Sequence, residues 1–244
     1  MSAQRGEWIA ALYVETGGAY YGLPDVDPWD EARDARTYPG PWPVVAHPPC
    51  ERWGRMWFGS PWKPDPGKYR LGDDGGCFEA ALEAVRKWGG VLEHPEASHA
   101  WAAFGINKPP RNGGWITADV HGGWTCCVEQ GHYGHRARKM TWLYAVGCVL
   151  PALQWGGSGQ RLDPVLLQTR GYEYARRSGI TGSVGGKWKK RQRAATPIPF
   201  RDVLLAMARD MEAGRVQTFD KLVLIERRDA SAQRDAALNR QARR

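Results

Sequence analysis

VVAHPPC (residues 44–50) and VLEHP (residues 91–95) are the two stretches of this sequence that decide its fold. Each begins with a short apolar run, which is typical of a buried strand, and then turns polar. The first stretch ends in Cys50 on a Pro-Pro turn, and the second reaches Glu93 as its apolar run ends. Polar residues that follow parallel strands gather at one edge of a sheet. We therefore expect Cys50 and Glu93 to face one pocket.

The rest of the chain alternates between strand and helix signals. Further strand signals fall at residues 8–14, 124–128 and 142–146, and apolar residues recur at helical spacing over 78–88 and 199–211. Gly17-Gly18 follows the first strand, and Gly89-Gly90 ends the first helix just before the strand at 91–93. This order predicts an α/β fold with a mainly parallel sheet and helices on both of its faces.

The remaining segments are polar and set the expected domain limits. Residues 24–43 contain Pro and Asp-Pro punctuation, with a short helix possible at 29–35, and residues 61–76 read as a loop. Residues 156–193 form a Gly- and Arg-rich basic insertion that ends in five basic residues between Lys187 and Arg193. We expect one domain over residues 1–213 and a charged extension, either a solvated helix or disordered, over 214–244.

Charge and cysteine content narrow the functional classes. The 244 residues carry a formal net charge of +8, which favours an anionic partner such as nucleic acid. The five cysteines include no Cys-x-x-Cys pair, so neither a zinc ribbon nor a thioredoxin-like motif is indicated, and no metal site is expected. No apolar stretch is long enough for a membrane span, and no signal peptide is recognisable at the N-terminus. A cytoplasmic protein with reduced thiols is expected.

Several fragments occur in the order of one family's motifs. They are Leu12 to Gly18 (a modified glycine turn), Pro48-Pro49-Cys50, Leu92-Glu93-His94-Pro95, Tyr133 to Arg138 with the strand closing on Gly147, and Thr196 to Phe200 entering a helix. Together they resemble the C5-cytosine DNA methyltransferase family. The resemblance implies a truncated Rossmann-like methyltransferase sheet and DNA as the partner. Short proteins of this kind are carried by phages, so the expected location is the host cytoplasm.

The resemblance also implies roles for individual residues. Cys50 would add as a thiolate to C6 of cytosine, and Glu93 would hold N3 and the exocyclic amine. Arg136 and Arg138 would line the same pocket or its phosphate rim and lower the pKa of Cys50, with help from His47. The target base would be flipped out of the duplex.

S-adenosylmethionine is the cofactor that the resemblance implies. Thr16, Gly17 and Gly18 would wrap it at the end of the first strand, and Pro48 would line its pocket. Asp27 is assigned here as the ribose carboxylate. Two other aspartates, Asp25 and Asp30, could take the same role, and no spacing separates the three.

The chain departs from the family pattern at several points. Glu15 replaces the first glycine of the turn, and His94 replaces the usual asparagine. The stretch 18–50 is short, so strands for the ribose and adenine contacts are expected to be largely missing, and no clear target-recognition domain is present. Three interpretations stay open: methyl transfer, the same Cys50 and Glu93 chemistry with another donor or a nucleotide substrate, and nucleic-acid binding without catalysis.

Overall fold

The computed structural model describes residues 8–60, 63–64, 68–135, 138–158, 164–178 and 195–211. All of them belong to one compact unit, Met1–Met211. The predicted extension over 214–244 and the basic residues between Lys187 and Arg193 lie outside the described residues.

A seven-stranded mixed sheet forms the centre of this unit, in the order β2-β1-β3-β6-β9-β8-β7. The strands are β1 (Ile9–Leu12), β2 (Val26–Trp29), β3 (Val44–Ala46), β6 (Gly90–Pro95), β7 (Ile116–Thr117), β8 (Trp124–Glu129) and β9 (Met140–Val146). β2, β1, β3 and β6 run parallel, whereas β6–β9, β9–β8 and β8–β7 are antiparallel pairs. The α/β class is confirmed, but the parallel arrangement holds for one half of the sheet only.

β2 corrects the expectation that residues 18–50 lack a further strand. It pairs with β1 from Ile9–Val26 to Leu12–Trp29 and forms the edge of the sheet. Its Val-Asp-Pro-Trp sequence carries a weak strand signal, because proline is confined to edge strands and similar positions. After β2 the chain forms two 3-10 helices, η1 (Glu31–Arg33) and η2 (Ala35–Thr37), where a short helix was predicted.

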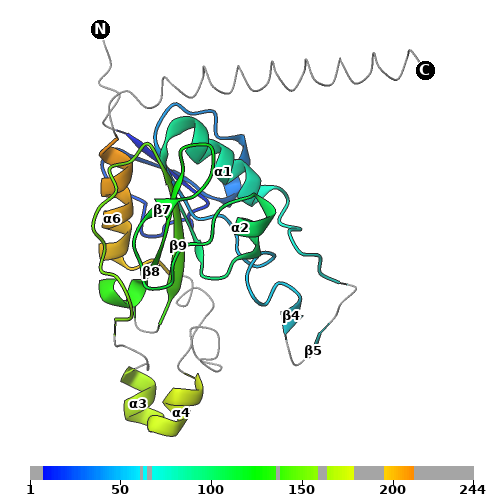
Figure 1. The fold of residues 1–244 in the computed structure, drawn as a ribbon, viewed down its shortest axis with the longest axis vertical. Coiled ribbons are helices and arrows are strands. Elements are labelled where there is room, and N and C mark those ends of the chain that lie inside the picture. The colour runs from blue at the N-terminus through cyan, green and yellow to red at the C-terminus, as the bar shows by residue number, and fades with distance from the viewer. Residues whose placement is uncertain are drawn as a thin grey trace, which may run out of the picture. The chain divides into compact units, whose positions relative to one another are not determined.

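Helices cover both faces of the sheet (Figure 1). α1 (Cys77–Trp88) and α2 (His99–Ala103) lie on one face, and α6 (Ile198–Arg209) lies on the other. α1 buries Phe78, Leu82 and Val85, and α6 buries Phe200, Leu204 and Met207 against the sheet. α1 and α6 were both predicted from their apolar spacing, whereas α2 was not. A further pair of short helices, α3 (Pro164–Arg170) and α4 (Tyr172–Ser178), lies within the predicted basic insertion.

Gly90 allows β3 and β6 to pair closely. It adopts a φ of +117°, and a Cβ atom added there would collide with the backbone of Val44. Because β-strand side chains alternate between faces, the register starting at Gly90 sends Val91 and Glu93 toward the α6 face and Leu92 and His94 toward the α1 face. Val91 accordingly belongs to the apolar core with Phe200 and Leu204 of α6.

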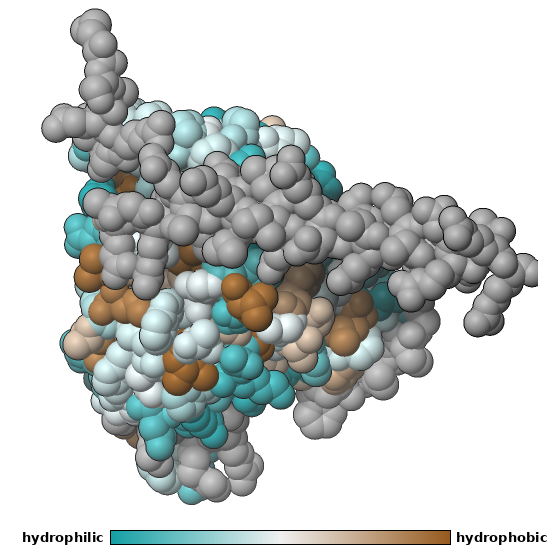
Figure 2. Space-filling view, turned by 45° about the horizontal axis from the view of Figure 1, so that its top comes forward, coloured by the Kyte–Doolittle hydropathy of each residue, from teal (hydrophilic) through white to brown (hydrophobic). Residues whose placement is uncertain are grey.

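On the face drawn in Figure 2, apolar side chains form separate patches between hydrophilic ones. Among the described residues, no helix is both long enough and apolar enough to cross a membrane.

Candidate functional site

β3 and β6 lie side by side, but β6 continues past the end of β3, so Glu93 lies within its strand rather than just past it, as the sequence had predicted. Ala46 pairs with Leu92, and each strand then continues into its polar residues. The Nδ1 atom of His47 lies 2.9 Å from Oε2 of Glu93. The chain that leads to Cys50 is therefore tied directly to the Glu93 carboxylate.

This edge of the sheet contains a topological switch point. β1 has β2 as its neighbour on one side and β3 on the other. The connection from β1 to β2 and the connection from β2 to β3 therefore run in opposite directions across the sheet. In open α/β sheets, ligands bind outside the carboxyl ends of the strands at such a point. Tyr13, just past β1, has a left-handed φ of 60°, and its hydroxyl group is buried without a hydrogen-bond partner. Such strained residues cluster at functional sites.

Glu93 is buried and hydrogen-bonded on both of its carboxylate oxygens. Gln130 donates from Nε2 to Oε1 at 3.0 Å, and Thr141 donates to the same oxygen at 3.4 Å. His47 approaches the other oxygen, Oε2. The Gln130 amide also donates to Thr141 at 2.9 Å, so these groups form one connected network. A buried carboxylate with partners on both oxygens is held in one orientation.

The network keeps Glu93 ionised. Burial raises the pKa of Glu93, but the Lys139 ammonium and the hydrogen bond from His47 outweigh it and bring the pKa down to about 2. The carboxylate therefore stays charged over the whole physiological pH range and can only accept hydrogen bonds. In this state Glu93 can stabilise a cationic or hydrogen-bond-donating group but cannot act as an acid.

Tyr20 extends the network from His47 toward β1. Its hydroxyl oxygen lies 2.8 Å from Nε2 of His47, and its side chain is buried. Burial is the main reason why the pKa of Tyr20 is raised well above its ordinary value, and the nearby Glu93 carboxylate adds to it. The hydroxyl group therefore keeps its proton.

Cys50 begins the turn that follows Pro48-Pro49. Its carbonyl oxygen accepts hydrogen bonds from the amides of Trp53 at 3.1 Å and Gly54 at 2.7 Å. Pro48 is buried, whereas the Cys50 side chain is partly exposed and carries a thiol rather than a disulfide. The turn places Cys50 where a ligand can reach it. That its sulfur faces Glu93 stays a prediction.

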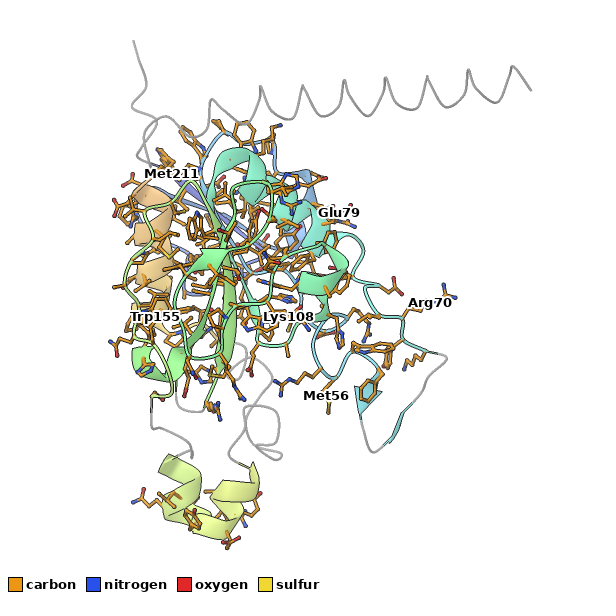
Figure 3. The ribbon with its side chains drawn as sticks, in the orientation of Figure 1. Met56, Arg70, Glu79, Lys108, Trp155 and Met211 are labelled. Atoms are coloured by element: carbon orange, nitrogen blue, oxygen red, sulfur yellow. The ribbon has the colours of Figure 1, made fainter. Side chains whose placement is uncertain are left out.

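The loop after Cys50 leads to a short hairpin of β4 (Gly59–Ser60) and β5 (Lys63–Pro64). Figure 3 shows Met56 and Arg70 on this loop, away from the sheet. Arg55, also on this loop, forms an ion pair with Glu96 at 3.1 Å. Arg111 forms a second ion pair with Glu96 at 3.0 Å. Charged side chains from two loops therefore meet just past β6.

Of the two predicted arginines, only Arg138 belongs to the described residues. Arg136 lies outside the described residues. Arg138 acts on Cys127, which belongs to β8. Burial raises the pKa of the Cys127 thiol, and the positive charge of Arg138 opposes this rise. Lys139 is the cation whose charge lowers the pKa of Glu93. It was missed because it appears in the sequence as one more residue of a basic run.

Thr16 and Asp30 join the loops after β1 and β2. Thr16 donates to Oδ2 of Asp30 at 2.7 Å, and Tyr21 donates to the same oxygen at 2.6 Å. The other oxygen accepts from the backbone amides of Ala32 and Arg33. Asp30, rather than Asp27, therefore stands at the carboxyl end of β2.

The other predicted cofactor residues are placed as follows. Asp27 lies within β2 and pairs with Arg33. Gly17 and Gly18 form a turn in which the amide of Gly18 donates to the carbonyl of Glu15 at 2.8 Å. This loop lies beside α6, because Arg201 donates to the carbonyl of Ala19 at 2.7 Å.

His94 has a structural role on the opposite face from Glu93. Its Nδ1 atom lies 2.8 Å from the hydroxyl oxygen of Ser98, which also caps α2 by accepting from the amide of Ala100. The ring stacks on Trp101. Burial lowers the pKa of His94 to about 4, although the charge of Glu93 opposes this effect. A neutral histidine thus replaces the expected asparagine and fixes the start of α2.

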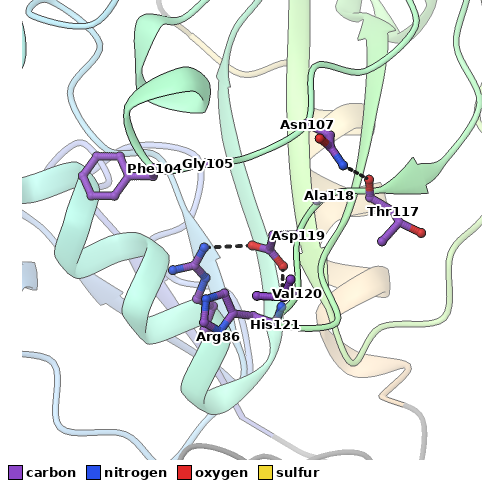
Figure 4. Close-up of a pocket in the computed structure, with 9 residues that line it drawn as sticks. All are labelled: Arg86, Phe104, Gly105, Asn107, Thr117, Ala118, Asp119, Val120 and His121. Carbon is purple, nitrogen blue, oxygen red and sulfur yellow. Dashed lines mark hydrogen bonds and ion pairs between the residues drawn. The ribbon is translucent and has the colours of Figure 1, made fainter. Parts of the chain in front are cut away.

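A cavity of about 510 Å³ lies at the other end of the sheet (Figure 4). Its charged groups, Arg86 and Asp119, pair with each other at 2.8 Å. Asp119 also accepts from Tyr144 and from the amides of His121 and Gly123. This carboxylate closes the turn before β8. The cavity is therefore a structural feature rather than part of the Cys50 and Glu93 site.

No protein-family model matches the chain, and no curated protein or solved structure matches it either.

Proposed function

We propose that this chain is an enzyme that acts at C5 of cytosine in DNA through a covalent adduct of Cys50. The observation that carries the proposal is the bond between His47 and Glu93, since it holds the Cys50 strand end beside an ionised carboxylate. The four parallel strands with a switch point between β1 and β3 support a Rossmann-like description of that half of the sheet. The net charge of +8 supports an anionic partner.

The chemistry needs a nucleophile and a group that stabilises a protonated ring. The Cys50 thiolate adds to C6, and N3 takes up a proton from water as the electron pair moves onto the ring. C5 becomes an enamine carbon and attacks an electrophilic carbon of the donor, whose leaving group departs with the electron pair of the broken bond. Loss of the C5 proton, then of the thiolate, and return of the N3 proton to water restore the aromatic ring. Glu93 accepts a hydrogen bond from the protonated N3 or the exocyclic amine at its remaining acceptor site, and it needs no proton of its own.

Methyl transfer from S-adenosylmethionine is the simplest form of this reaction. The residues at the end of β2 do not fit the ribose of that donor, however. A carboxylate has about four lone-pair sites, and those of Asp30 are taken by Thr16, Tyr21 and two backbone amides. Asp27 is paired with Arg33. We therefore derive no step through this donor. The occupied carboxylates favour the second candidate, the same Cys50 chemistry with another one-carbon or larger donor, or with a nucleotide substrate.

Trapping with DNA that contains 5-fluorocytosine tests the proposal. Fluorine at C5 cannot leave as a proton does, so an adduct that has reacted with a donor carbon stays bound. We expect the wild-type protein, incubated with this DNA and a cell extract as the source of donor, to form a complex that survives denaturation. Cys50→Ser should abolish the complex, and Cys77→Ser, which changes another partly exposed thiol, should retain it. Absence of any complex, with DNA binding intact, would favour nucleic-acid binding without catalysis.

A further inference from the structure

The ring of His47, which follows β3, connects Tyr20 with Glu93 of β6 through two short hydrogen bonds. The hydroxyl oxygen of Tyr20, which follows β1, lies 2.8 Å from Nε2, and Oε2 of Glu93 lies 2.9 Å from Nδ1. Both partners are buried, at 4% and 8% relative exposure. The arrangement leaves the imidazole no freedom to turn without breaking both bonds.

The direction of each hydrogen bond follows from the charge of Glu93. An ionised carboxylate only accepts, so Nδ1 of His47 must carry a hydrogen. In the neutral imidazole the other nitrogen is then an acceptor, and the Tyr20 hydroxyl, which keeps its proton, donates to it. Tyr20 therefore stabilises the tautomer of His47 that donates to Glu93.

We propose that Tyr20 and His47 are positioning residues that fix Glu93 as a hydrogen-bond acceptor, and that this arrangement selects cytosine over uracil and thymine. The inference rests on the proposed function, because it concerns the base that Cys50 attacks. The inference assigns a role to two further residues, Tyr20 and His47, neither of which touches the base. It also gives a reason why cytosine is chosen.

The selection arises when the thiolate has added to C6. In the cytosine adduct, N3 takes up a proton and the exocyclic nitrogen carries hydrogens, so two donors face Glu93. In the uracil or thymine adduct N3 also carries a hydrogen, but negative charge rests on O4 and would face the carboxylate, with no hydrogen between the two oxygens. Glu93 has one acceptor site left for the base, on Oε2, because His47 occupies the other site of that oxygen and Gln130 and Thr141 occupy those of Oε1. A buried polar pair left without its hydrogen is penalised far more than a matched pair is rewarded.

The charges around Glu93 support one fixed protonation state. Burial raises the pKa of the Glu93 carboxyl group, but the ammonium of Lys139, which precedes β9, and the hydrogen bond from His47, which follows β3, outweigh it. Gln130 adds a neutral donor from the turn after β8. No group among these favours a protonated Glu93, so the acceptor state persists when a base enters.

The resting protein offers a first test that needs no activity. Nitrogen-15 spectra of labelled histidine distinguish a ring hydrogen on Nδ1 from one on Nε2, and His47→Asn identifies the His47 signals. In the neutral ring we expect the hydrogen on Nδ1, with Nε2 as an acceptor. Free neutral imidazoles prefer the opposite tautomer. A His47 ring that carries its hydrogen on Nε2 overturns the proposal.

Base choice is the second test. Matched oligonucleotides with 5-fluorocytosine or 5-fluorouracil at one position give two trapping rates, whose ratio reports selection separately from folding. We expect the wild type to prefer fluorocytosine by about 100-fold or more. Tyr20→Phe, which removes only the hydroxyl, should lower that ratio about ten-fold, and His47→Phe should lower it further. His47→Asn, whose amide can still donate to Glu93, should retain part of it.

Controls separate this inference from the proposed function. Tyr38→Phe removes a hydroxyl that bonds the backbone of Trp42 and is not one of the groups that bond Glu93 or His47. This variant should leave the ratio unchanged. A merely structural role for Tyr20 predicts equal loss of both rates and an unchanged ratio, and that result overturns the inference. A wild type that traps neither base refutes the proposed function and the selection with it, while the histidine spectrum still decides the positioning.

Discussion

Glu93 carries a negative charge inside the protein, and this makes the stability of the fold depend on pH. Its pKa falls from 4.5 to about 2 on folding, because Lys139 and His47 outweigh the effect of burial. The folded state therefore binds fewer protons than the unfolded chain. The contribution is fully present above about pH 5 and is lost as the pH falls toward 2. At pH 7 it stabilises the fold by about 3 kcal/mol, an order-of-magnitude figure.

Lys139→Met should weaken that contribution. Without the ammonium, the pKa of Glu93 rises, so the free energy of unfolding at pH 7 should fall by about 1 to 2 kcal/mol. The difference from the wild type should shrink only as the pH approaches 2, where Glu93 of the folded wild type takes up its proton. Urea unfolding at pH 7 and at pH 2 measures both. Lys108→Met, which removes an exposed ammonium, is the control and should change neither value by much. Equal losses for both variants would contradict the assigned role of Lys139.

Residue types and positions revealed part of this site from the sequence alone. Cys50 and Glu93 were predicted to follow neighbouring strands, and the strands do pair. Tyr20 was missed because its partner lies 27 residues away, and the contact between His47 and Glu93 spans 46 residues. Such contacts depend on how loops return to the sheet, for which a single sequence carries no pattern.

At the scale of elements, strong periodicity was predictive and short or interrupted segments were not. α1 and α6 have clear apolar faces and were found, whereas β2 contains aspartate and proline and α2 has only five residues. The antiparallel half of the sheet was also missed, because a buried strand has the same apolar run in either direction. Tertiary pairing decides that direction.

Gly90 is the element-scale position on which the site depends. Alanine there would have to keep a φ of +117° and place its Cβ against the backbone of Val44, so β3 and β6 would have to separate. We expect Gly90→Ala to lower the free energy of unfolding by about 2 to 4 kcal/mol. Gly105→Ala tests the conformational part alone, since Gly105 also has a positive φ but open space around it. It should cost about 1 kcal/mol. Equal losses would show that the close approach of the strands is unimportant.

At the scale of the whole molecule, the residues that would activate the base are in place, whereas those that would bind the ribose of the donor are not. β6 offers an ionised acceptor, Glu93, which is bonded to His47 in the chain that leads to Cys50. The end of β2 offers a carboxylate whose pKa is lowered by hydrogen bonds from Tyr21 and Thr16, the groups that occupy it. The same residues that hold the loops after β1 and β2 together therefore exclude a ribose from Asp30.

Calorimetry with S-adenosylmethionine and S-adenosylhomocysteine decides whether that exclusion matters. We expect the free wild-type protein to bind both ligands more weakly than micromolar, because a ribose hydroxyl must displace Tyr21 or Thr16 from Asp30. Tyr21→Phe opens one acceptor site on Oδ2 and should tighten binding about five-fold, the worth of one hydrogen bond near 1 kcal/mol. Tyr38→Phe removes a hydroxyl elsewhere and should have no effect. Micromolar binding by the wild type would show that Asp30 is not the ribose contact and would strengthen methyl transfer. No binding by any variant, with or without DNA, would instead favour a different donor for the Cys50 adduct.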